Sequence, residues 1–60
     1  MEFMEDKVIQ IVEDAYLASN KDREYCNELV IDKLLTELDP ADVGNAMLIA
    51  SDKLLEKKWY

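Results

Sequence analysis

The chain has no histidine, and the only cysteine among its 60 residues is Cys26. A lone thiol cannot form an internal disulfide, and a zinc site would have to be built from Cys26 and carboxylates alone. A cysteine or serine nucleophile would also lack the imidazole base that ordinarily activates it. We therefore expect no metal, no cofactor and no catalytic residue, and we predict that the protein is not an enzyme.

Glycine and proline are equally scarce, with Gly44 and Pro40 the single examples. Strands joined by tight turns need more of both residues. Apolar residues recur instead at spacings of three and four, which is the period of an α-helix. The sequence predicts an all-α fold, and its length fits a single helical domain over residues 1–60.

Basic residues are outnumbered, with 7 lysines and arginines against 14 acids and a formal net charge of −7. Residues 1–42 carry a net −8 and residues 43–60 a net +1. Phosphate groups of nucleic acids and anionic lipids repel such a chain. No apolar run approaches the roughly 18 residues that span a bilayer, and the first residues lack the basic stretch of a signal peptide. We expect a cytoplasmic protein with no direct nucleic-acid binding and no membrane binding.

The period of the apolar residues predicts three helices, over about residues 3–18, 22–38 and 40–58. Three early acids, Glu2, Glu5 and Asp6, suit the positive end of the first helix dipole. Lysines near residue 58 suit the negative end of the third. Two short connections make neighbouring helices antiparallel, so we expect a small three-helix bundle.

The two connections carry recognisable capping residues. Asn20 can take the left-handed conformation that ends a helix, and Ser19 or Asn20 can cap the next one, with Asp22 in its first turn. Asp39 is expected to cap the third helix, because Pro40 follows at the first helical position. These capping residues indicate where the helices begin and end, but they give no information about function.

Each of the first two helices has one broad apolar face. In the first it comprises Met4, Val8, Ile11, Val12, Ala15 and Tyr16. In the second it comprises Cys26, Val30, Ile31, Leu34, Leu35 and Leu38. Cys26 is therefore expected to be a small core residue. A chain of this length is marginal as a monomer, so homodimerisation is one way to complete the core.

The predicted helix over residues 40–58 has more apolar surface than two neighbouring helices can cover. One row, with Val43, Met47, Ala50 and Leu54, suits the core. A second row contains Leu48, Ser51, Leu55 and Trp59, which we name the candidate contact surface. Three readings stay open: the other helices cover this surface, a second copy covers it, or a different protein covers it.

The predicted helix over residues 22–38 offers two smaller features. Tyr25 and Leu29, the secondary patch, point away from its main apolar face. Beside them Glu24, Glu28 and Asp32 recur every four residues as an acidic stripe. The patch is a candidate second contact, and the stripe is either a binding feature or only a solubilising face.

These features favour a non-enzymatic protein-binding module that acts as a small acidic inhibitor or adaptor through the candidate contact surface. Its partner is expected to be another protein, with a homodimer also expected. A phage or mobile-element origin is a hypothesis from size alone. Two alternatives remain: an inhibitor that mimics nucleic acid through its acidic stripes, and a structural subunit of a larger assembly.

Overall fold

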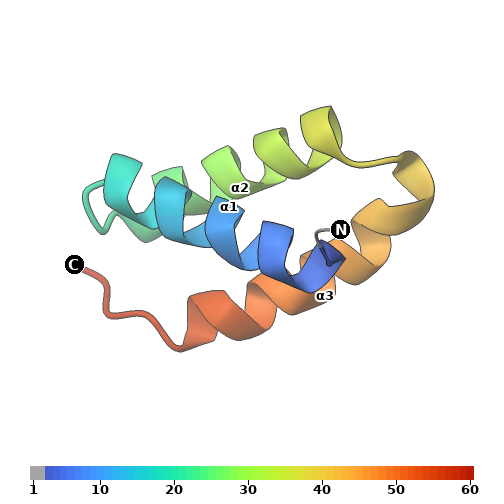
Figure 1. The fold of residues 1–60 in the computed structure, drawn as a ribbon. Helices are drawn as coiled ribbons and strands as arrows, with labels where there is room; N and C mark the ends of the chain where they lie inside the picture. Colours follow the sequence, from blue (N-terminus) through green and yellow to red (C-terminus); the bar gives the residue numbers. More distant parts are fainter. Residues whose placement is uncertain (1–2) are drawn as a thin grey trace.

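The computed structural model describes residues 3–60, which fold into three helices packed against one another (Figure 1). They are α1 (Met4–Ala18), α2 (Arg23–Glu37) and α3 (Pro40–Leu55). The predicted three-helix bundle is confirmed, and the bundle measures 33 × 17 × 17 Å. Glu2, one of the acids assigned to the first helix start, lies outside the described residues. No helix within residues 3–60 is long and apolar enough to cross a membrane.

The connection between α1 and α2 differs in detail from the prediction. Asn20 takes the left-handed conformation as expected, with φ 56°, but Lys21 does so as well, with φ 65°. Two such residues delay the start of α2, so the capping position moves from Ser19 or Asn20 to Asp22. The Asp22 carboxylate accepts a hydrogen bond from the Tyr25 amide at 3.1 Å, which satisfies one of the free donors at the helix start.

The start of α3 is where the sequence placed it, with Asp39 extended and Pro40 in the first turn. The capping bond expected from Asp39 is absent, because its carboxylate accepts no hydrogen bond from any described amide of α3. Its backbone carbonyl accepts the Asp42 amide instead, at 2.8 Å. Pro40 and the backbone turn therefore define this boundary without a side-chain cap.

The core is formed by all three helices. Its buried members are Val8, Ile11, Val12, Ala15, Cys26, Val30, Leu34, Ala46 and Ala50. Alanine is the only buried residue type that α3 contributes, and its small side chain lets the helix backbone approach α1 and α2. Leu35, predicted on the apolar face of the second helix, is 64% exposed, because a step of 100° from fully buried Leu34 turns its side chain outward.

The third helix ends at Leu55, three residues before its predicted end. After Glu56 the chain leaves the helix and turns toward the connection between α1 and α2 (Figure 1). There the Tyr60 amide donates to the Lys21 carbonyl at 3.2 Å. The tail gains partners on α1 that a continued helix would have carried past the end of the bundle.

Candidate contact surfaces

The outer face of α3 carries the three helical members of the candidate contact surface. Leu48 and Leu55 are 71% and 74% exposed, and Ser51 between them is exposed as well. Buried Ala46 and Ala50 lie on the opposite side of the same helix. Neither α1 nor α2 therefore covers these two leucines. Each isolated exposed leucine would be ordinary, but two on one helix face, seven residues apart, form a shared surface.

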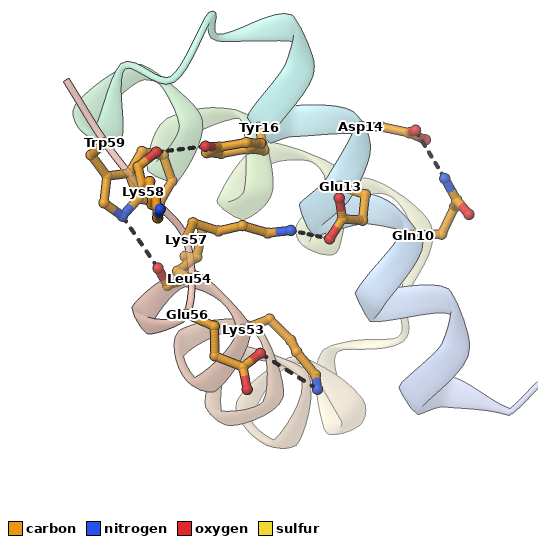
Figure 2. Close-up of polar contacts among 10 residues, drawn as sticks. All are labelled: Gln10, Glu13, Asp14, Tyr16, Lys53, Leu54, Glu56, Lys57, Lys58 and Trp59. Carbon is orange, nitrogen blue, oxygen red and sulfur yellow. Dashed lines mark hydrogen bonds and ion pairs between the residues drawn. The ribbon is translucent and has the colours of Figure 1, made fainter.

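Trp59 belongs to the tail rather than to α3, contrary to the prediction that it continues the helical row of Leu48, Ser51 and Leu55 (Figure 2). Its half-buried ring meets Tyr16 edge-on, with the ring centroids 5.1 Å apart. Its indole Nε1 donates to the Leu54 carbonyl at 3.3 Å, a carbonyl at the end of the helix that also accepts the Lys57 amide at 3.2 Å. These contacts hold the indole against the end of the bundle.

An open groove of about 490 Å³ runs between α2 and α3 and ends at the tail. The residues that line this α2–α3 groove are Arg23, Glu24, Asn27, Ser51, Leu54, Leu55 and Trp59. Three of the four residues of the candidate contact surface thus lie together. The fourth, Leu48, is exposed one turn before Ser51 on α3 but does not line the groove.

Of the α2 residues that line this groove, Glu24 belongs to the predicted acidic stripe, whereas Arg23 and Asn27 were not predicted. Arg23 and Asn27 are polar and four residues apart, so they share one side of α2 opposite Ser51 and Leu55. Hydrophobic periodicity does not register them, because both are polar residues. The antiparallel register of α2 and α3 was the missing information: Arg23 lies near the level of Leu55, and Asn27 near that of Ser51.

Gly44 continues the exposed side of α3 one turn before Leu48. A Cβ atom placed on it would meet no described atom within 4 Å, and its φ is not positive. Glycine inside a helix costs about 0.5–1 kcal/mol relative to alanine. Nothing in the packing of the single chain requires a glycine here, so this position is open to close approach by another backbone.

A second, smaller hollow of about 200 Å³ lies between α1 and α2. The residues that line this α1–α2 hollow are Ile11, Asp14, Ala15, Ala18, Leu29, Asp32, Lys33 and Glu37. Leu29 of the secondary patch is part of its floor and is partly buried against the core. Tyr25, the other member, is 50% exposed and does not line the hollow.

The acidic stripe turns around α2 rather than following its axis. Four residues advance a helix by 400°, so each step of the stripe shifts by 40°. Glu24 consequently lines the α2–α3 groove, whereas Asp32 lines the α1–α2 hollow. Glu28 lies between them, and all three carboxylates are exposed. Within residues 3–60 none of the three forms an ion pair.

Other acids are paired with lysines. Lys57 of the tail reaches Glu13 on α1, and its ammonium also lies 5.1 Å from the centre of the Tyr16 ring (Figure 2). The Lys33–Glu37 and Lys53–Glu56 pairs are longer and more exposed. Exposed pairs of this kind each contribute about 0–1 kcal/mol. Among these three pairs of the described chain, the Lys57–Glu13 pair alone joins elements distant in sequence.

Cys26 is fully buried in the core. Burial raises the pKa of its thiol, while contact with the Ser19 hydroxyl and the charge of Lys57 act in the opposite direction. A neutral thiol is a poor nucleophile, so this environment suits a packing role. Within residues 3–60 no group of three or more cysteine and acidic side chains is arranged to hold a metal ion.

Comparisons with known proteins add no relationship to this geometry. No protein-family model matches the chain, and neither the curated proteins nor the solved structures include a significant match.

Proposed function

We propose that this chain is a non-enzymatic protein-binding domain that acts through the candidate contact surface on α3 and the tail. The observation that carries the proposal is the exposure of Leu48 and Leu55 on a helix whose opposite side is packed into the core. Burying a leucine side chain contributes about 1.5–3 kcal/mol. Two leucines therefore offer a partner enough apolar contact to offset part of the cost of association.

The α2–α3 groove supplies shape beside these leucines. Ser51 and Leu55 form one wall, and the indole of Trp59 closes one end. A partner side chain that enters the groove would contact apolar Leu54 and Leu55 beside polar Arg23 and Asn27. Tryptophan is enriched among the residues that dominate binding free energy. This combination supports an inhibitor or adaptor that works by occupying the surface of another protein.

A second copy of the chain is one partner that charge permits. Two molecules of net charge −7 repel each other, but residues 43–60 carry a net +1. Contact through α3 would therefore bring together the least acidic part of each molecule. Gly44 and Ser51, seven residues apart on that side, would let two helices approach closely. A homodimer and a complex with a different protein are both included in the proposal.

The test compares three exposed leucines. Leu48→Asp and Leu55→Asp each place a charge on the candidate contact surface, and Leu17→Asp is the matched control, since Leu17 is 75% exposed on α1. Light scattering reports self-association, and capture by the tagged chain from its native host reports other partners. We expect both α3 variants to lose association while circular dichroism shows retained helix content. Equal effects of all three substitutions, or none, would contradict the assignment of the surface.

One observation favours the mimicry of nucleic acid as a second candidate: Glu24, Glu28 and Asp32 are exposed and form no ion pair within residues 3–60. Binding through these charges should weaken steeply as salt rises, because salt screens exposed charges. Binding through the leucines should persist or strengthen in high salt. Measuring partner affinity at two salt concentrations separates the two functions.

A further inference from the structure

The α1–α2 hollow combines an apolar floor with a charged rim. Ile11 and Ala15 are buried members of the core, and partly buried Leu29 completes the apolar floor from α2. Asp14 on α1 and Asp32 on α2 are both exposed at the rim. Carboxylates from two helices thus border one apolar depression.

The charges around this hollow are unbalanced. Its lining includes three carboxylates and a single ammonium group, that of Lys33. Nζ of Lys33 lies 3.9 Å from Oε2 of Glu37, and both side chains of this pair are solvent-exposed. Such a pair contributes little and is easily exchanged for another partner. Asp14 and Asp32 have no ion pair within residues 3–60.

One rim carboxylate is already held in position. Gln10 lies one turn before Asp14 on α1, and its side-chain amide donates to Oδ1 of Asp14 at 2.9 Å (Figure 2). An ionised carboxylate has several acceptor sites, so this bond leaves Asp14 able to accept further donors. Because the Asp14 side chain is already ordered, it loses less conformational entropy when a cation binds.

We propose that the α1–α2 hollow binds the arginine side chain of a basic polypeptide segment. The methylene stem of arginine can cover an apolar floor while its charged end stays at the rim. The planar guanidinium has five donors, which suits carboxylates on two walls better than the single ammonium of lysine. This site lies away from the candidate contact surface, so the inference goes beyond the function proposed for α3.

Charge and size both select this occupant. Residues 1–42, which provide every residue of the hollow, carry a net −8 and attract a basic segment over a distance of about 10 Å at moderate salt. A hollow of about 200 Å³ holds single side chains rather than a whole helix. The attraction is therefore general for basic segments, and the hollow adds a local preference for arginine.

The experiment titrates the ¹⁵N-labelled full chain with acetylated, amidated pentaarginine and follows backbone amide shifts by NMR. We expect saturable shifts in residues 11–18 and 29–37. Pentalysine should bind several-fold more weakly. The same peptide made with citrulline, which has the shape of arginine without its charge, should give no saturable shifts. These three peptides separate charge from guanidinium geometry.

Two double variants make the location testable. Asp14→Asn with Asp32→Asn removes the two unpaired carboxylates of the three that line the hollow, and should weaken pentaarginine binding about tenfold, the expected loss of two exposed charge pairs. Glu24→Gln with Glu28→Gln removes the same charge outside the hollow and should change affinity less than twofold. Equal weakening by both variants would overturn the proposal. Shifts centred on α3, or equal binding of the citrulline peptide, would overturn it too.

Discussion

The indole of Trp59 meets the ring of Tyr16 edge-on, with centroids 5.1 Å apart and ring planes inclined at 79°. The Tyr16 hydroxyl donates to the Lys58 carbonyl, so the same tyrosine holds the tail at two places (Figure 2). Lys57, which precedes Lys58 and Trp59 in the tail, pairs with Glu13, one turn before Tyr16 on α1. The last residues are therefore part of the folded bundle, and Trp59 serves packing as well as the groove.

The tail contacts predict that Trp59→Ala destabilises the protein. Aromatic pairs contribute about 0.5–1.5 kcal/mol beyond the burial of area. Since Trp59 is only half-buried, we expect a total loss of about 2 kcal/mol, below the loss for a fully buried tryptophan. Urea denaturation followed by circular dichroism measures it. Tyr60→Ala is the control, because that side chain is 90% exposed and should cost less than 0.5 kcal/mol. Equal losses would contradict the packing role.

Adjacent Leu34 and Leu35 predict opposite outcomes. Leu34 is fully buried and Leu35 is 64% exposed. Leu34→Ala should cost about 2–5 kcal/mol, because it leaves a cavity in the core. That loss is comparable to the whole stability of so small a domain, so thermal melting should begin at low temperature. Leu35→Ala should shift the free energy of unfolding by less than 1 kcal/mol. Similar losses would mean that Leu35 is covered, for instance by a second copy.

The two aspartates that precede helices also make a matched pair. Asp22 caps α2 with a hydrogen bond to Tyr25, whereas the Asp39 carboxylate accepts no bond from the described amides of α3. Asp22→Ala should therefore cost about 1 kcal/mol, the usual loss of a cap. Asp39→Ala should cost a few tenths, the share of the helix dipole alone. Chemical denaturation of both variants measures the difference, and a larger loss at Asp39 would contradict it.

The sequence alone predicted the three helices and most of the core, because these depend on local periodicity. Buried Val8, Val12 and Leu34 all lie on predicted apolar faces. The position of Trp59 could not be predicted in the same way. After Leu55 the tail contacts Glu13 through Lys57 and Tyr16 through Lys58, at separations of 44 and 42 residues in sequence. Periodicity contains no information about such a contact.

The α2–α3 groove and the α1–α2 hollow were predicted only in part, because they too depend on contacts between distant segments. The exposed row on α3 follows from its own periodicity, but the opposite walls depend on the register between helices. Asn27 opposite Ser51, and Asp14 opposite Asp32, require two helices to be placed side by side. The acidic stripe shows the same limit. Its four-residue repeat suggests a single helix face, yet Glu24 lines the α2–α3 groove and Asp32 lines the α1–α2 hollow.

Burial of Cys26 predicts a specific dependence of stability on pH. The pKa of its thiol is raised in the folded protein above the ordinary value of 9.0, mainly by burial. Above that pH the unfolded state loses the proton while the folded state retains it, so the unfolded state becomes favoured. The stability that the neutral thiol contributes is thus complete below pH 9 and lost as pH rises through the folded pKa.

Comparison with Cys26→Ala isolates this effect, because alanine does not titrate. The difference in unfolding free energy between the wild type and the variant should be constant from pH 6 to 8 and shrink above pH 9. The thiol should react with a disulfide reagent slowly in buffer and rapidly in urea. A constant difference at every pH, or fast reaction of the folded protein, would contradict the burial of Cys26.

Gly44 gives a prediction that separates the single chain from a complex. A Cβ atom at this exposed helical position meets nothing within 4 Å, so Gly44→Ala should stabilise the isolated chain by about 0.5–1 kcal/mol. Ser51→Ala is the control on the same side of α3, where a gain of a few tenths is expected. Thermal unfolding at low protein concentration measures both. If the benefit of Gly44→Ala disappears as concentration rises, a second copy packs against this glycine, because the added methyl group would obstruct it. Destabilisation at every concentration would instead contradict the open position of Gly44.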